Sequence, residues 1–333
     1  MSPGPRPTAD SSLAAPECAE ALGRAPAAEA AAEYESALQH RLRYLVRVDQ
    51  PLVLISQAGR SGGTLLLRLF DDHPECHVVP YELQRIFRGM SGDLSSAEAA
   101  WRSLVAEKQF ARRRPFLLRP RLQRAIFEEC AGRSTSSSPR ELLDCFFTSY
   151  FNGWLDNRNL RTGPKRWVVG FEPGATKLEA HARHYPDGRV ISLVRDPWSW
   201  YASRREKRAK WADIAVAIGD WSKHVSSALD LQGASPDRVR VVLLADLLAR
   251  TETTMRALAD WLAIDFTESL LRPSFNGLPA GGRSSFHDVG SDISVVPLKR
   301  GSALTAEESS FVADRAGGLY ERATAAALPI GRA

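Results

Sequence analysis

Short apolar runs alternate with amphipathic segments along most of the chain, and this pattern predicts alternating strands and helices. Runs typical of buried strands cover residues 51–56, 166–171, 189–194 and 238–244. Helical spacing of apolar residues covers 65–72, 175–184, 211–229, 253–263 and 305–325. Strands that alternate with helices form a parallel sheet covered by helices on both faces. We therefore predict an α/β fold, a three-layer α/β/α sandwich around a central parallel sheet.

Three segments fall outside this alternation. Residues 1–33 are rich in Ala, Pro and Glu and contain little that could form a core, so we expect a flexible tail. Apolar residues at helical spacing predict an amphipathic helix over 34–48 and a mainly helical stretch over about 85–160. We expect a single domain over 34–333, in which 85–160 is a helical insertion.

Composition narrows the class of protein. With 44% hydrophobic and 25% charged residues, the 333-residue chain is globular rather than fibrous or mostly disordered. Its four cysteines, at 18, 76, 130 and 145, lack zinc-site spacing, which favours a reducing cytoplasm. No apolar run is long enough to cross a membrane, and the Pro-rich start lacks a signal-peptide core. We expect a cytoplasmic protein, and its net charge of +5 favours anionic ligands.

A glycine-rich loop separates the first predicted strand from its helix. Gly59, Gly62 and Gly63 allow close approach of the backbone to a ligand, Arg60 adds a positive charge and Thr64 adds a hydroxyl. Backbone N–H groups at the start of a helix form a phosphate cradle, so the loop predicts phosphate binding. An ordinary strand–helix turn that needs glycine for its geometry is the alternative.

A second motif follows the strand at 189–194. Arg195 stands at the carboxyl end of this strand, and Ser203 lies on the next predicted helix. Ligands of open α/β sheets bind at the carboxyl ends of the strands, where an arginine and a serine can converge on one anion. The alternative is local: Arg195 and Asp196 would form an ion pair and cap the helix.

Together the two motifs resemble those of the sulfotransferases that use 3′-phosphoadenosine-5′-phosphosulfate (PAPS). Residues 59–67 resemble the 5′-phosphosulfate loop of the bacterial-type branch with Arg-Ser-Gly, and 193–197 with Ser203 resemble the 3′-phosphate motif. The resemblance extends over roughly 52–321. It implies the P-loop-like sulfotransferase fold and transfer of a sulfuryl group from PAPS to a hydroxyl or amine. The product of the donor would be 3′-phosphoadenosine-5′-phosphate (PAP).

The resemblance also implies a set of site residues. Those expected to hold the 5′-phosphosulfate are Gly59, Arg60, Ser61, Gly62, Gly63, Thr64 and Leu65. Arg195 and Ser203 would hold the 3′-phosphate. Lys299, Arg300 and Gly301 resemble a late basic loop that also reaches this phosphate in some branches of the family, and a solvated charge pair is the alternative. Two positions depart from the family pattern. Gly63 replaces the first threonine of a usual pair, and Glu172 replaces a lysine that precedes a proline.

Sulfuryl transfer needs cations for the developing charge and a base for the acceptor proton, so Arg60 and a carboxylate are the expected catalytic groups. The branch with an arginine loop places this base soon after the first helix, where Glu82 stands. His77 and His73 are the alternatives for the base. A glutamate that merely begins a helix is the alternative role for Glu82. No metal is expected, because no fourth ligand accompanies these side chains.

Two other functions share the same motifs. A P-loop kinase using ATP and Mg²⁺ is the first, but the GxxxxGK[ST] loop it needs is absent: Ala58 stands in place of the first glycine and the lysine is missing. The second is a nucleotide-binding relic without turnover. The basic residues of 102–124 would attract an anionic acceptor or form a solvated face. We expect a small-molecule, glycan or lipid acceptor rather than nucleic acid, since aromatic residues are not interleaved.

Overall fold

The structure, a computed structural model, describes residues 27–82, 90, 92–105, 118–133, 138–173, 178–206, 211–279, 293 and 295–330. The chain divides into two compact units, residues 1–45 and 46–333. The first contains helix α2 (Ala27–Arg43), which starts and ends earlier than the predicted helix of 34–48. Alanines favour the earlier start. The helix cannot include Val48, because Thr148 accepts a hydrogen bond from its backbone amide (2.9 Å).

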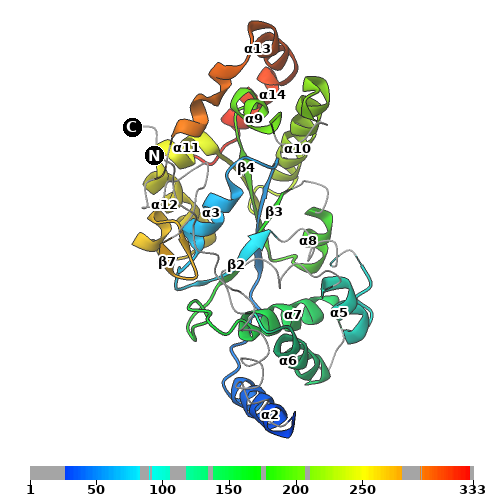
Figure 1. Ribbon diagram of the computed structural model, residues 1–333. Helices are drawn as coiled ribbons and strands as arrows, with labels where there is room; N and C mark the ends of the chain where they lie inside the picture. Colours follow the sequence, from blue (N-terminus) through cyan, green and yellow to red (C-terminus); the bar gives the residue numbers. More distant parts are fainter. Residues whose placement is uncertain are drawn as a thin grey trace, which may run out of the picture. The chain divides into compact units, whose positions relative to one another are not determined.

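A five-stranded parallel sheet forms the centre of the second unit (Figure 1). Its strands are β1 (Leu52–Gln57), β2 (Cys76–Glu82), β3 (Trp167–Pro173), β4 (Arg189–Val194) and β5 (Val239–Leu243), in the order β2-β3-β1-β4-β5. Gln57 of β1 pairs with Leu193 of β4, so these two strands end side by side. From β1 the chain continues to β2 at one edge of the sheet, whereas from β4 it continues to β5 at the other edge. Such a switch point is where open α/β sheets bind ligands.

Helices cover both faces of this sheet, as the alternation of side chains along β1 shows. Leu52 and Leu54 pack in one core with α5 and α7, whereas Val53 and Ile55 pack in another with α3 and α12. The helices up to β4 are α3 (Gly63–Phe70), α5 (Ala97–Val105), α6 (Pro120–Arg133), α7 (Pro139–Gly153) and α8 (Leu178–His184). Those after β4 are α9 (Pro197–Arg204), α10 (Ile214–Ala234), α11 (Leu244–Ala249) and α12 (Thr251–Leu262). The predicted three-layer α/β fold is confirmed.

Strand β2 is the element that the sequence pattern did not predict. It contains Pro80, which cannot donate to a neighbouring strand, and proline is confined to sheet edges and irregular positions. β2 lies at the edge of the sheet, and its register with β3 shifts between Val78 and Glu82. The sheet order therefore permits a strand where local sequence argues against one. Helices α5, α6 and α7 follow β2 within the predicted insertion of 85–160.

The C-terminal segment completes the second unit. It includes the 3₁₀ helix η2 (Glu268–Leu271), then strands β6 (Ser274–Phe275) and β7 (Leu278–Pro279), and the 3₁₀ helix η3 (Val296–Ala303). The closing helix predicted for 305–325 is present as α13 (Ala306–Val312), a π-helical turn η4 (Ala313–Gly317) and α14 (Gly318–Ala325). Within the described residues, no helix has both the length and the apolar character needed to cross a membrane.

Candidate active site at the carboxyl ends of β1 and β4

The loop after β1 has its carbonyl groups fixed by side-chain donors. The carbonyls of residues 58, 59 and 60 accept hydrogen bonds from the Ser61 hydroxyl (2.7 Å), the Trp200 indole (3.0 Å) and the Arg195 guanidinium (3.1 Å). In a planar trans peptide the carbonyl and the following N–H point in opposite directions. Fixing these carbonyls therefore turns the amide of residue 59 away from the Ser61 hydroxyl, that of residue 60 away from Trp200 and that of residue 61 away from Arg195. This arrangement is suited to an anion.

Space and backbone angles explain the glycines that follow. Gly62 has a φ of 99°, and a Cβ there would lie 2.6 Å from Leu244 Cδ1. A Cβ at Gly63 would lie 2.3 Å from Cε2 of the Phe171 ring, closer than any real contact. The Gly63 amide donates to Gln57 Oε1 at 2.6 Å. The missing threonine at position 63 thus follows from the Phe171 ring, which fills the space a side chain would need.

Arg195 is the most deeply buried cation beside this loop, with 1% of its surface exposed. It donates to the carbonyls of Arg60 and Pro297. Burial lowers the pKa of Arg195 to about 10; Asp196 opposes this effect, and the charges of Arg300 and Arg60 add to it. Three guanidinium groups thus lie close enough to repel one another. An anion placed among them would relieve that repulsion.

Asp196 does not neutralise Arg195 by an ion pair. No salt bridge between the two side chains occurs in the described part of the chain. The Asp196 carboxylate instead accepts a hydrogen bond from the Ser199 amide at 2.7 Å and caps helix α9. The local alternative of the sequence analysis is therefore half right: Asp196 caps the helix, but Arg195 bonds only to backbone carbonyls.

Helix η3 brings the late basic loop to the same place. The Ser199 hydroxyl donates to the Leu298 carbonyl (2.8 Å) and accepts from the Gly301 amide (3.2 Å), which holds η3 against α9. A Cβ at Gly301 would lie 3.0 Å from Trp198 Cβ, so glycine permits this close packing. Arg300 acts electrostatically on the half-buried Arg60 and the buried Arg195, whereas Lys299 is exposed.

Helix α9 carries two further residues of interest, Ser203 and Arg204. Ser203 is 1% exposed, and its hydroxyl has no hydrogen-bond partner among the described residues. The Arg204 guanidinium lies 3.4 Å from the centre of the Trp211 ring, and its Nη1 would lie 2.8 Å from a Cβ on Gly59. Sequence analysis did not single out Arg204. Its position directly after Ser203 was the available signal.

A model of the sulfotransferase family matches residues 51–268 of the chain. The chain belongs to this family. Its members are enzymes that typically use PAPS as the sulfuryl donor. The match includes the glycine loop, Arg195 and Ser203 but stops before η3.

Several solved structures are similar to this sulfotransferase. A sulfotransferase domain from the curacin biosynthetic pathway is 18% identical, with coverage of 80% of this chain and 98% of that one (TM-score 0.47). A sulfotransferase domain from the Synechococcus PCC 7002 olefin synthase is 18% identical, with coverage of 80% and 94% (TM-score 0.48). Mouse sulfotransferase SULT7A1 complexed with PAP is 11% identical, with coverage of 87% and 94% (TM-score 0.42). No curated protein sequence matches the chain.

The proposed base of the sulfotransferase lies on the same edge of the sheet as the loop. Glu82 is the last residue of β2 and pairs with Phe171 of β3, which pairs in turn with Ile55 of β1. Its side chain lies outside the described residues, as does that of Glu172, whose backbone pairs with Ser56. Residues 83–89 lie outside the described residues, so the alternative of a glutamate that begins a helix is not tested by the position of Glu82 at the end of β2.

Both alternative bases lie elsewhere. His77 pairs with Val168, which pairs with Leu52 at the start of β1, roughly 16 Å along the strand from the glycine loop. Burial lowers the pKa of His77 to about 3. Both ring nitrogens of His73 have backbone partners. Among the described residues, no three His, Cys, Asp or Glu side chains are grouped closely enough to hold a metal ion.

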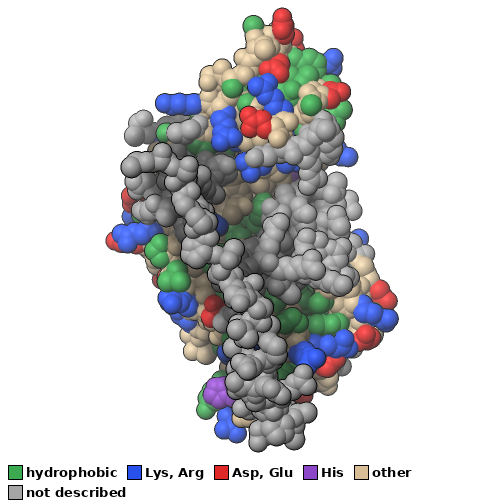
Figure 2. All heavy atoms as spheres, viewed as in Figure 1, with side chains coloured by type: hydrophobic (Ala, Val, Ile, Leu, Met, Phe, Trp, Pro, Cys, Tyr) green, Lys and Arg blue, Asp and Glu red, His purple; other side chains and the backbone are tan. Residues whose placement is uncertain are grey.

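The basic stretch of 102–124 is only partly described, since residues 106–117 lie outside the described ranges. Arg124 forms ion pairs with Glu98 (3.0 Å) and Glu128 (2.7 Å), and Arg102 lies 3.7 Å from Glu98. On the face shown in Figure 2, blue and red side chains lie next to one another at the lower right. Arg102 and Arg124 are therefore paired on a solvated surface, whereas Arg119 and Arg121 are exposed without an ion pair among the described residues.

Proposed function

We propose that this sulfotransferase transfers the sulfuryl group of PAPS to a hydroxyl or amine of a small-molecule, glycan or lipid acceptor. The donor would bind at the carboxyl ends of β1 and β4. The observation that carries the proposal is the cluster of Arg60, Arg195 and Arg300, in which Arg195 has no carboxylate partner among the described residues. A donor with phosphate groups at both the 5′ and the 3′ position would supply the missing negative charge.

We divide these residues into two groups, as the resemblance to the family implies. The 5′-phosphosulfate would contact the amides of residues 59–61, the start of α3 from Gly63 to Leu65, and the Arg60 charge. The 3′-phosphate would contact Arg195, the unpartnered hydroxyl of Ser203, and Arg300. The Ser203 hydroxyl fits this role because a buried hydroxyl without a partner costs free energy that a phosphate oxygen would recover.

Catalysis would depend on positioning and charge. The acceptor attacks sulfur in line with the leaving phosphate oxygen, and the cations beside the loop stabilise the negative charge that develops there. Glu82 would take the acceptor proton. The family usually has a lysine where this chain has Glu172, so one positive charge is missing. The Arg204 guanidinium beside Gly59 would supply a positive charge in its place.

The direct test of the donor is a thermal-shift comparison of PAP, adenosine 5′-phosphate and ATP, each with and without Mg²⁺. Ligand at a hundred times its dissociation constant adds about 2.7 kcal/mol of stability, which raises the melting temperature by several degrees. We expect the largest shift with PAP, independent of Mg²⁺. A shift with ATP and Mg²⁺ but none with PAP would instead favour the kinase.

The base is tested by Glu82→Gln, with transfer from PAPS to a panel of phenols, alcohols and amino sugars as the assay. We expect the turnover number to fall about a hundredfold or more while PAP affinity stays the same. Glu252→Gln, an exposed glutamate of α12, is the matched control. Full activity of Glu82→Gln would remove Glu82 from this role, and PAP binding without any turnover would favour the relic.

A further inference from the structure

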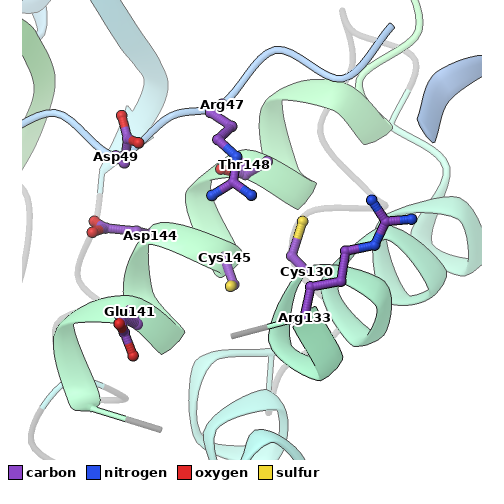
Figure 3. A pocket seen from close by; sticks show the side chains of 8 residues that line it. All are labelled: Arg47, Asp49, Cys130, Arg133, Glu141, Asp144, Cys145 and Thr148. Atoms are coloured by element: carbon purple, nitrogen blue, oxygen red, sulfur yellow. The ribbon is translucent and has the colours of Figure 1, made fainter. Parts of the chain in front are cut away.

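Two cysteines on neighbouring helices face a common cavity. Cys130 of α6 and Cys145 of α7 line a cavity of about 210 Å³, together with Arg47, Asp49, Arg133, Glu141, Asp144 and Thr148 (Figure 3). Both thiols are half-buried, so they are shielded but accessible through the cavity. In Figure 3, Arg47 reaches towards the cysteines from the segment that precedes β1, and Arg133 lies on the same helix as Cys130.

The two thiols are chemically unequal. A hydrogen bond from the Cys145 thiol is the main cause that lowers the pKa of Cys130, and the charges of Arg47 and Arg133 act in the same direction. The same hydrogen bond, together with burial, raises the pKa of Cys145. The thiolate is the nucleophile in disulfide exchange, and two cations, Arg47 and Arg133, line the cavity with the cysteines. Cys130 is the expected attacking sulfur because it lies one helical turn from Arg133 on α6, and Cys145 is the second sulfur.

Cys76 provides a contrast within the same chain. It is 1% exposed in the core of the sheet, and burial raises its pKa to about 12. A thiol in that environment is inert. Reactivity towards small oxidants is therefore expected at the helix pair and not at Cys76.

We propose that Cys130 and Cys145 are a redox-active dithiol that reacts with low-molecular-weight disulfides and closes into a disulfide bond between α6 and α7. The Cys130 thiolate attacks one sulfur of the small disulfide, whose S–S bond breaks and releases one thiolate. Cys145 then gives up its proton and attacks the Cys130 sulfur, which releases the second thiolate. The released thiolates take up the two protons that the cysteines lose. Two protein thiols are oxidised, and one small disulfide is reduced to two thiols.

The dithiol lies away from the proposed donor site. Thr148, in the turn of α7 after Cys145, accepts a hydrogen bond from the Val48 amide, just before β1 begins. The glycine loop follows the other end of β1. The disulfide would therefore tie α6 to α7 without closing the donor site, and the proposal does not depend on PAPS as the donor.

The experiment uses the full chain with Cys18→Ser, which removes the cysteine outside the described residues. The folded protein is treated with oxidised glutathione at pH 7.5, acid-quenched, alkylated and digested without reduction. We expect one peptide pair joined through Cys130 and Cys145, and Cys76 alkylated only after unfolding. In the Cys145→Ser variant, the reaction should stop at the mixed disulfide between glutathione and Cys130. In the Cys130→Ser variant, Cys145 should react with oxidised glutathione at least tenfold more slowly than Cys130 does in the parent protein.

Two controls keep the result decisive. Melting temperatures of the cysteine variants within a few degrees of the parent show that they are folded, and PAP affinity within twofold shows that the effect is confined to the helix pair. The proposal is overturned if both cysteines stay reduced while Cys76 is protected. It is equally overturned if each carries glutathione without forming the cross-link.

Discussion

A half-buried arginine, Arg140, and a buried one, Arg195, lie near opposite ends of the same strands, and their surroundings differ. Arg140, near the amino ends of β1 and β4, donates to both oxygens of Asp144 (3.0 Å each) and to Asp187 (3.0 Å). It also donates to the carbonyls of Asp49 and His184 and lies 4.1 Å from the centre of the Tyr185 ring. Although burial opposes the charge, the neighbouring Asp144, Tyr185 and Asp187 raise the pKa of Arg140 overall.

Arg195 lies at the carboxyl ends of β1 and β4, and its surroundings disfavour its charge rather than stabilise it. Its bonds go to two backbone carbonyls, its charged neighbours include Arg60 and Arg300, and its pKa is lowered. The protein supplies a complete set of acceptors to the structural arginine and an incomplete set to the other. A buried cation left without a carboxylate is a better indicator of a ligand site than a buried cation alone.

The largest expected effect is on Arg195. Arg195→Ala should weaken PAP binding by about 10- to 150-fold, because it removes a charge-assisted contact worth about 1.5–3 kcal/mol. Binding of adenosine 5′-phosphate, which lacks the 3′-phosphate, should change much less. Isothermal titration with both ligands measures the difference. Equal losses for the two ligands would reject the 3′-phosphate role.

Arg140→Ala should produce the converse result. The substitution removes the Arg140 Nε–H from which both oxygens of Asp144 accept, and since both side chains are partly exposed we expect a loss of about 2–3 kcal/mol in the free energy of unfolding. PAP affinity should stay within twofold. Urea unfolding and titration of the same sample measure both quantities. A large loss of PAP affinity in a folded variant would contradict the division between the two edges.

His77 provides a pH-dependent test near the amino edge. Its folded-state pKa of about 3 lies below the unfolded value of about 6.5, so protonation of the unfolded chain destabilises the fold as pH falls through this window. Between pH 7.5 and pH 5 this amounts to about 2 kcal/mol. His77→Phe should remove that part of the acid destabilisation, as measured by urea unfolding at the two pH values. An unchanged pH dependence would show that His77 is not the titrating group.

Ser203→Ala should have the smallest effect. Loss of one hydroxyl contact to a phosphate is expected to weaken PAP binding about fivefold and to leave the free energy of unfolding nearly unchanged, since the hydroxyl has no described protein partner. Ser199→Ala is the matched control, because its hydroxyl bonds to Leu298 and Gly301 within the protein. A stability loss at Ser203 as large as that at Ser199 would indicate a structural role.

Much of the fold was predictable from local sequence. The apolar runs of β1, β3, β4 and β5 are buried strands, and the strand predicted for 189–194 matches β4 at both ends. The motif residues Arg60 and Arg195 follow two of these strands, so their placement at the carboxyl edge was predictable as well. Strand β2 was not predictable, because Pro80 argues against a strand unless the strand is known to lie at an edge.

Only the tertiary structure decided which distant groups meet. The sheet order makes β1 and β4 neighbours, η3 carries Arg300 to α9, and the Phe171 ring excludes a side chain at Gly63. Cys130 and Cys145 show no motif in the sequence, yet packing of α6 against α7 places both on one cavity. The physical reason is range: periodicity and turn chemistry act over a few residues, whereas these contacts depend on how whole elements pack across the sheet.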